Sequence, residues 1–485
     1  MKLHSLLKAL PLTKAPRENP DIKSITNDTR NVGPGALFIC IKGHQTDGHH
    51  FAKEAVEKGA VAVLAEKAMA VERPVIIVPD TKRAMAVLAD EFYGHPTQSL
   101  HVVGITGTNG KTTTSIMIEN IFRDAGKKTG LIGTIHIKIG DRMIETKNTT
   151  PDNIALQQTF ADMVEEGVHA AAMEVSSHAL VQGRVMGCDF DVAVFTNLSQ
   201  DHLDYHKTME EYKRAKGLLF SRLGNIYDRN KPKFAVINSD DPAGTYFAKE
   251  TSAHVITYGI DQPADFSAES IQMGADGTSF ILAAPDGKRQ LKMKLMGKFS
   301  VYNALAAITA AYVSSVPLDS AIHSIEQMDG VPGRFEAVNG GQDFSVIVDY
   351  AHTPDSLENV LKTIRQFAKS RIFTVVGCGG DRDRTKRPLM AKVACTYSSN
   401  PIFTSDNPRT EDPMAILADM ESGVKGQHYK VIPDRKEAIR AAIREAGEGD
   451  VVLIAGKGHE TYQIIGEKVI DFDDRLEAMK AIEEL

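Results

Sequence analysis

Short runs of Val, Ile, Leu and Ala alternate with segments of helical periodicity along the whole chain, and this alternation constrains the fold more than any other feature. Short apolar runs bounded by turn residues are typical of buried parallel strands, and helices connect such strands. The sequence therefore predicts an α/β fold. A chain of 485 residues is too long for one hydrophobic core, and at roughly 100–200 residues per domain it suggests about three domains.

Two turns that contain Gly and Pro divide the chain into three units. The turn Gly94-His-Pro-Thr97 closes the first α/β stretch and places a boundary near residue 98. The turn Gly330-Val-Pro-Gly-Arg334 precedes a new apolar run at Ser345–Val348 and places a second boundary near residue 331. We therefore expect domains at residues 1–98, 99–331 and 332–485.

The composition excludes several classes of protein. Hydrophobic residues make up 42% of the chain and charged residues 25%, as in globular proteins, so disordered and coiled-coil classes are excluded. The 56 Lys and Arg against 63 Asp and Glu give a net charge of -7, so no basic excess predicts a nucleic-acid partner. No apolar run reaches the roughly 20 residues of a membrane helix, and no signal peptide is recognisable. We expect a cytoplasmic protein without a membrane segment.

A glycine-rich loop follows the apolar run His101–Thr106 and opens a segment with helical spacing. This context is the one that a phosphate-binding P-loop requires, although Ile105 stands where the strict motif has its first glycine. Backbone N–H groups would face phosphate oxygens, Lys111 would reach the terminal phosphates and the Thr112 hydroxyl could bind Mg²⁺. The expected ATP-binding residues of the loop are Gly107, Thr108, Asn109, Gly110, Lys111, Thr112 and Thr113. The central unit should therefore contain a parallel sheet like that of P-loop ATPases.

Polar side chains follow the next two apolar runs, at Met173–His178 and Asn197–Asp204. Their carboxylates and hydroxyls are ligands that Mg²⁺ prefers, so with a P-loop nearby we expect a metal site here rather than two solvated strand ends. The segment Glu211–Phe220 predicts a helix whose lysines form an exposed face, and spacing alone does not distinguish Lys216.

In the third unit, glycines and charged residues follow three strand-like runs directly. These loops begin at Gly377, Ser405 and Gly456. Ligands of open α/β sheets bind beyond the carboxyl ends of the strands, so we expect the loops to converge on one site of a Rossmann-like domain.

Six motifs, in order along nearly the whole chain, resemble those of the Mur ligases. They are the P-loop, Glu174-Val-Ser-Ser-His178, Asn197 with Asp201–Asp204, Met296–Asn303, Gly333–Glu336 and Asp349-Tyr-Ala-His-Thr-Pro354. The resemblance implies one domain each for a UDP-linked substrate, ATP and an incoming amino acid, which matches the three units above.

The resemblance also implies roles for single residues. It implies ATP binding by Asn303, Arg334, Asp349 and His352 beside the P-loop. It implies binding of the UDP-substrate by Thr29, His44, Gln45, Thr46, Asn148, Thr149, Thr150, Ser176, Gln182 and Arg184. Catalysis would involve Lys111, Glu174, His202 and Lys216, with Mg²⁺ held by Thr112, Glu174, His202 and a carbamylated Lys216. An ammonium cannot ligate Mg²⁺, whereas a carbamate is anionic and offers two oxygens.

Specificity is implied by the segment Asp406–Arg409, which matches the motif of family members that use meso-diaminopimelate. The amino-acid site would comprise Arg382, Asp406, Asn407, Pro408, Arg409, Gly456 and Glu460. An Arg fork suits bidentate binding of the second carboxylate, which lysine lacks. We therefore expect ATP-dependent addition of meso-diaminopimelate to UDP-N-acetylmuramoyl-L-alanyl-D-glutamate through an acyl phosphate, by a monomer. The alternatives are a lysine-adding ligase, a folylpolyglutamate-type ligase and, from a different class, a P-loop nucleotide switch.

Overall fold

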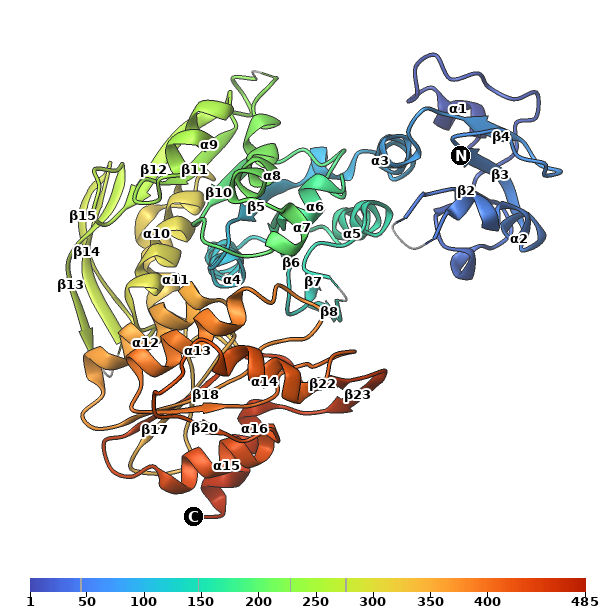
Figure 1. Ribbon diagram of the computed structural model, residues 1–485. Coiled ribbons are helices and arrows are strands. Elements are labelled where there is room, and N and C mark those ends of the chain that lie inside the picture. The colour runs from blue at the N-terminus through green and yellow to red at the C-terminus, as the bar shows by residue number, and fades with distance from the viewer. Residues whose placement is uncertain (44–45, 147, 227, 275–276) are drawn as a thin grey trace.

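The computed structural model describes residues 1–485 except 44–45, 147, 227 and 275–276. Three sheets with their helices follow one another along the chain (Figure 1). The N-terminal sheet stands apart at the upper right, the central sheet is the largest, and the C-terminal sheet lies below it. This arrangement confirms the predicted α/β fold. Among the helices of the described residues, none has the length and apolar character needed to cross a membrane.

The N-terminal sheet has four parallel strands in the order β1-β2-β3-β4. Its elements are α1 (Leu3–Leu7), β1 (Ser24–Thr26), η1 (Thr29–Asn31), β2 (Ala36–Ile39), η2 (Gly48–Phe51), α2 (Ala52–Glu57), β3 (Ala60–Ala65), β4 (Val75–Ile77), α3 (Thr81–Phe92) and η3 (Pro96–Ser99). Leu6 of α1 and Leu88 of α3 pack on one face, and Ala52 and Ala55 of α2 pack on the other. The small sheet is therefore covered on both sides.

The central sheet has eleven strands in the order β15-β14-β13-β12-β11-β10-β5-β9-β6-β7-β8. Its strands are β5 (His101–Thr106), β6 (Thr129–Ile132), β7 (Ile137–Ile139), β8 (Arg142–Ile144), β9 (Ala170–Glu174), β10 (Val192–Phe195), β11 (Phe234–Asn238), β12 (His254–Gly259), β13 (Phe266–Gly274), β14 (Gly277–Ala284) and β15 (Gly287–Met293). Neighbours run parallel from β6 to β13, as expected, but β7 and β8 at one edge and β14 and β15 at the other are antiparallel. The predicted parallel sheet is therefore the middle of a mixed sheet.

Helices cover both faces of the central sheet. They are α4 (Lys111–Asp124), α5 (Asn153–Glu165), α6 (Ser177–Val181), α7 (Leu203–His206), α8 (Met209–Ser221), α9 (Gly244–Glu250), α10 (Lys298–Val313) and α11 (Leu318–Gln327). Apolar side chains of α4, α10 and α11 form one core, and those of α5, α8 and α9 form the other. Because β9, β5 and β10 are neighbours in this parallel region, the loops that follow them leave the same edge of the sheet.

The C-terminal sheet has six strands in the order β16-β17-β21-β18-β19-β20, and all but β16 are parallel. Its elements are β16 (Glu336–Val338), β17 (Ser345–Asp349), α12 (Pro354–Phe367), β18 (Ile372–Val376), α13 (Lys386–Tyr397), β19 (Asn400–Phe403), α14 (Pro413–Glu421), β20 (Lys430–Val431), α15 (Arg435–Glu445), β21 (Val451–Ala455), the hairpin β22 (Tyr462–Ile465) and β23 (Lys468–Asp471), and α16 (Asp474–Glu483). In Figure 1, α12 and α13 lie between this sheet and the central unit, and α15 and α16 cover the far face.

Candidate active site

The glycine-rich loop joins β5 to α4 and follows the predicted strand, loop and helix. A Cβ at Gly107 would lie 1.9 Å from Thr196 Oγ1, and one at Gly110 would lie 2.4 Å from Asn303 Oδ1. Gly110 also has a φ of 85°, a conformation that other residues rarely adopt. Both positions therefore require glycine, since the loop runs close against β10 and α10.

Two lysines, the half-buried Lys111 and the buried Lys216, meet at the carbonyl of Gly107. Lys111 Nζ donates hydrogen bonds to Gly107 O at 2.9 Å and Thr108 O at 2.8 Å, and Lys216 Nζ donates to Gly107 O at 2.7 Å. Lys216 is only 1% exposed and lies 4.4 Å from the centroid of the Tyr212 ring. The expectation of an exposed lysine face is therefore wrong for Lys216. Burial and the nearby Lys111 hold the pKa of Lys216 well below 10.5.

Glu174 ends β9 and lies beside the start of α4. Its Oε2 accepts a hydrogen bond from Thr112 Oγ1 at 3.0 Å, and its Oε1 accepts one from the backbone N–H of Thr134 at 2.7 Å. The side chain is buried, and a hydroxyl and a carboxylate oxygen thus lie side by side. These are ligands that Mg²⁺ prefers. Within the described ranges, no cluster of three or more His, Cys, Asp or Glu could hold a metal ion by itself.

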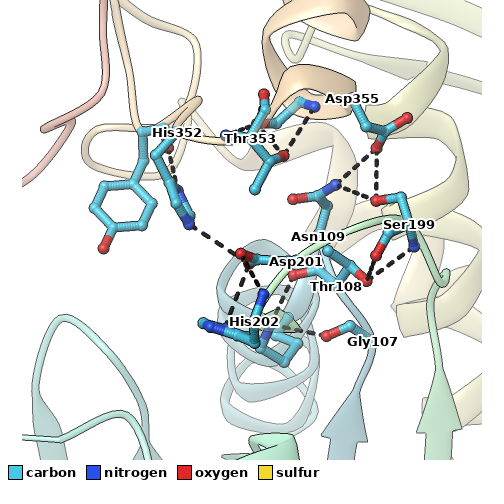
Figure 2. Close-up of polar contacts among 12 residues, drawn as sticks. Gly107, Thr108, Asn109, Ser199, Asp201, His202, His352, Thr353 and Asp355 are labelled. Atoms are coloured by element: carbon cyan, nitrogen blue, oxygen red, sulfur yellow. Dashed lines mark hydrogen bonds and ion pairs between the residues drawn. The ribbon is translucent and has the colours of Figure 1, made fainter. Parts of the chain in front are cut away.

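Asp201 lies where the central and C-terminal units meet (Figure 2). Its Oδ2 is 3.4 Å from His202 Nε2 and 3.9 Å from His352 Nε2. Burial opposes ionisation, yet the two imidazoles hold the pKa of Asp201 below its usual value. Burial lowers the pKa of His352 to about 4, and its Nδ1 lies 2.9 Å from the carbonyl of Tyr350.

A second contact between the units involves the P-loop itself. Asp355, in the first turn of α12, accepts hydrogen bonds from Asn109 Nδ2 at 2.8 Å and Ser199 Oγ at 3.2 Å. Figure 2 shows the Asp355 carboxylate directed at both side chains. The C-terminal unit therefore touches the phosphate loop directly.

Arg334 and Asp349 complete this side of the site. Arg334 Nη2 donates to Thr112 Oγ1 at 3.1 Å, and its guanidinium lies 4.4 Å from the centroid of the Tyr350 ring. Asp349 Oδ2 accepts a hydrogen bond from the backbone N–H of Phe335 at 2.7 Å. Burial raises the pKa of Asp349 to about 6. Arg334 thus carries a positive charge to the P-loop from the C-terminal unit.

These groups line one cavity of about 510 Å³ between the central and C-terminal units. Of the residues predicted from the sequence, the lining includes Thr108, Asn109, Gly110, Lys111, Thr112, Thr113, Thr149, Glu174, Ser176, His202, Lys216, Asn303, Arg334, Asp349 and His352. Gly107 adjoins them through its carbonyl. The structure therefore brings the predicted nucleotide and metal residues together.

Part of the set predicted for the UDP-substrate forms a second group beside this cavity. Arg184 donates to Gln182 Oε1 at 2.8 Å and to Thr150 O at 2.8 Å, and the Thr150 hydroxyl accepts from the N–H of Ser176 at 3.1 Å. Asn148 is exposed nearby in the chain. Thr29 in η1 and Thr46 belong to the N-terminal unit, and within the described ranges no hydrogen bond joins them to this group. His44 and Gln45 lie outside the described residues.

The loops after β18, β19 and β21 converge, as predicted from their positions. Asn407 Nδ2 donates to Glu460 Oε2 at 2.8 Å, and Arg409 Nη1 donates to Gly380 O at 2.8 Å. A Cβ at Gly456 would lie 2.6 Å from Asp406 Oδ2, and Pro408 is buried in the same loop. Arg382 is exposed, and its Nη1 donates to Asp381 O at 3.1 Å.

Sequence reasoning assigned no role to several residues of these loops. Lys457, which is fully buried, donates to Glu460 Oε2 at 2.8 Å. Beneath the loops, buried Arg435 and Asp474 form two hydrogen bonds of 2.7 Å, and Arg435 Nη2 also donates to Ala455 O at 3.0 Å. One sequence feature could have indicated a role for Lys457, because it stands between two glycines directly after a buried strand. No sequence feature indicates a role for Asp355 or Arg435.

Models of known families match three stretches of the chain. They are the Mur ligase middle domain at residues 105–311, the glutamate ligase domain of Mur ligases at 333–458 and the catalytic domain of the Mur ligase family at 21–93. Together they cover parts of all three sheets.

Full-length relatives and a solved structure agree with these matches. Proteins named UDP-N-acetylmuramoyl-L-alanyl-D-glutamate–2,6-diaminopimelate ligase are 60% identical in Listeria monocytogenes serotype 4b and 59% identical in Geobacillus thermodenitrificans. The Listeria match covers 100% of this chain and 99% of the relative, and the Geobacillus match covers 100% of both. A solved structure of the same name is 36% identical, covers 100% of this chain and 99% of its own, and has a TM-score of 0.71. The chain belongs to the Mur ligase family.

Proposed function

We propose that this chain joins meso-diaminopimelate to the D-glutamyl carboxylate of UDP-N-acetylmuramoyl-L-alanyl-D-glutamate at the cost of ATP, in peptidoglycan synthesis. The observation that carries the proposal is a P-loop cavity together with a cluster of side chains formed by Asp406–Arg409 and Glu460, here named the amino-acid pocket. The His459 ring lies 5.1 Å from the Tyr350 ring, and Tyr350 in turn packs on Arg334. These contacts link the loop after β21 to Tyr350 and Arg334, which line the nucleotide cavity.

In the first step a D-glutamyl carboxylate oxygen attacks the γ-phosphorus of ATP, the bond to the β-phosphate breaks, and ADP leaves as the acyl phosphate forms. Two anions approach each other, so positive charge must be supplied at the P-loop. Lys111 in the P-loop and Arg334 beside Thr112 would supply it, and the phosphate oxygens would accept hydrogen bonds from the N–H groups at the start of α4. Bound Mg²⁺ would neutralise further phosphate charge, held by Thr112, Glu174, His202 and Lys216 as a carbamate.

The environment of Lys216 supports that carbamate. Only a neutral amine attacks carbon dioxide, and the lowered pKa of Lys216 raises the neutral fraction. Glu174 and Thr112 alone offer few ligands, and an anionic Lys216 would add two oxygens next to Gly107. The side chain is already held in place by burial.

In the second step the amine of meso-diaminopimelate attacks the acyl phosphate and phosphate leaves. Arg409 would bind the distal carboxylate, and Asp406 and Glu460 the distal ammonium, so that the other amine points toward the cavity. We also propose the division at residues 1–98, 99–331 and 332–485, and a separate sheet of at least four strands in each part supports it. The roles of Thr29, Thr46 and Arg184 at the UDP-substrate, the monomeric state and the cytoplasmic location stay predictions.

The test is a phosphate-release assay with ATP, the UDP-linked dipeptide and a panel of amino acids. We expect release with meso-diaminopimelate and little with L-lysine or L-glutamate. Release that needs lysine would indicate the lysine-adding alternative, and release with glutamate on a folate substrate would indicate the folylpolyglutamate type. Hydrolysis that ignores the UDP-substrate and responds to a protein would indicate a nucleotide switch.

A further inference from the structure

Lys457 forms a closed set of contacts with the two neighbouring loops. Its Nζ lies 2.8 Å from Glu460 Oε2 and 3.2 Å from Asn407 Oδ1, and Asn407 Nδ2 lies 2.8 Å from Glu460 Oε2. Each of the three side chains therefore contacts the other two. Lys457 is 0% exposed, and a lysine is rarely found fully buried unless it is paired. The contact thus joins the loop after β19 to the loop after β21.

These contacts fix the orientation of both partners. Asn407 Oδ1 also accepts a hydrogen bond from the backbone N–H of Ile464 at 3.0 Å. With its oxygen held by two donors, the Asn407 amide must direct its NH₂ group at Glu460. Glu460 Oε2 is then occupied twice, whereas its Oε1 accepts no hydrogen bond from any residue that the structure describes. One carboxylate oxygen is left for a ligand.

The charged side chains of the pocket determine its net charge. Asp406 and Glu460 carry two negative charges, and Lys457 cancels one of them. Arg435 is already neutralised by Asp474 in a pair that is 0% exposed on both sides. One negative charge therefore remains, close to the positive charge of Arg409. This pattern is complementary to one zwitterionic end of an α-amino acid, which carries one ammonium and one carboxylate.

We propose that Lys457 is a positioning residue for the amino-acid substrate: it orients Glu460 and sets the pocket to accept a single ammonium group. The proposal rests on the proposed function, because it concerns how the same pocket selects its amino acid. Without Lys457, the buried carboxylate of Asp406 and the half-buried carboxylate of Glu460 would lose the cation between them. One of them would then take up a proton and stop binding the ammonium.

The titration behaviour of the pocket agrees with this role. Burial and the charge of Asp406 raise the pKa of Glu460, and Lys457 opposes that rise. Burial would also raise the pKa of Asp406, but Lys457 and Arg435 hold it below its usual value. The charged and titratable groups around Glu460 are Asp406, Arg409, Arg435, Lys457, Tyr350 and Tyr462. Of these, only Lys457 donates a side-chain hydrogen bond to Glu460 as a cation.

The test compares the intact enzyme with Lys457→Met, Lys457→Arg and the control Lys468→Met, which removes an exposed lysine from β23. Phosphate release is measured against each substrate and against pH. We expect Lys457→Met to raise the KM for meso-diaminopimelate about tenfold or more, as loss of a hydrogen-bonded charge does, with the KM for ATP unchanged within about twofold. The acidic limb of kcat/KM for the amino acid should move to higher pH. Lys457→Arg should restore most of the loss, and Lys468→Met should behave as the wild type.

A double variant, Lys457→Met with Glu460→Gln, tests whether Lys457 acts through Glu460. If it does, the two substitutions together raise the KM for meso-diaminopimelate by less than the product of their separate effects. Because the double variant leaves no unpaired charge at residue 460, it carries the comparison even if Lys457→Met fails to fold. Independent, multiplying effects would overturn the proposal, as would a folded Lys457→Met enzyme with an unchanged KM or with a parallel rise for ATP. A wild-type enzyme that releases no phosphate with meso-diaminopimelate would instead overturn the proposed function.

Discussion

The contact of Asp355 with the P-loop leads to a quantitative prediction about how the two units close on the nucleotide. Asp355→Ala removes the acceptor of two hydrogen bonds, from Asn109 at 2.8 Å and from Ser199 at 3.2 Å. Hydrogen bonds to a charged group contribute about 1.5–3 kcal/mol each when buried. Asp355 is half-buried, so solvent screening reduces the pair to about 1–2 kcal/mol in total.

An energy of about 1–2 kcal/mol corresponds to a factor of about 5–30 in an equilibrium constant. We therefore expect Asp355→Ala to lower kcat/KM for ATP by about that factor, measured by phosphate release with both other substrates saturating. Asn109→Ala removes only one of the two hydrogen bonds and should have a smaller effect, and the double variant should cost little more than Asp355→Ala alone.

The control is Glu358→Ala, one turn further along α12. Glu358 accepts a hydrogen bond from Tyr397 at 2.7 Å and pairs with Lys362, so both of these polar partners belong to the C-terminal unit. This variant should stay within about twofold of the wild type. A normal Asp355→Ala enzyme, or losses in Asp355→Ala and Asn109→Ala that multiply fully, would refute the reasoning.

Three further predictions concern other parts of the site. Arg409→Lys replaces a planar fork by a point charge, so the KM for meso-diaminopimelate should rise about tenfold while the KM for ATP stays constant in the same assay; equal changes would contradict a role in the amino-acid pocket. Asp349 has its pKa raised by burial to about 6, so the folded state binds a proton more tightly than the unfolded state. Relative to Asp349→Asn, the melting temperature of the wild type should therefore rise as the pH falls from about 7 to about 5, and a constant difference would be the contrary result. Arg435→Met leaves Asp474 buried without its partner and should cost about 3–5 kcal/mol in chemical denaturation, whereas Arg435→Met with Asp474→Leu should recover most of that loss.

Short apolar strands bounded by turns were predictable from the sequence. The apolar run His101–Thr106 forms β5 with the same bounds. The run Ser345–Val348 forms β17, which extends one residue further, to Asp349, because its pairing with β21 continues to that residue. The antiparallel strands β13 to β15 were not predicted, since they alternate polar and apolar residues and gain their stability from one another.

In the site, residues of contiguous motifs were predictable from the sequence, and contacts between distant residues were not. The P-loop is contiguous in sequence, so its glycines and lysine could be recognised directly. The burial of Lys216 could have been inferred, because it lies four residues after Tyr212 and three before Leu219, on the helical stripe that faces the core. The contacts of Asp355 with Asn109 and of Lys457 with Asn407 join residues far apart in the chain. Only the packing of the sheets brings them together.

The strand order of the C-terminal sheet has a consequence for synthesis of the chain. Strand β21, Val451–Ala455, lies between β17 and β18, although it follows them by many residues. During synthesis on the ribosome, β17 and β18 therefore cannot pair with β21 until β21 has been translated. Parallel pairings between such distant segments form slowly. The central sheet has no such dependence on the last residues, because its strands end at Met293. A nascent chain can thus complete its phosphate-binding loop well before it has any pocket for the amino acid.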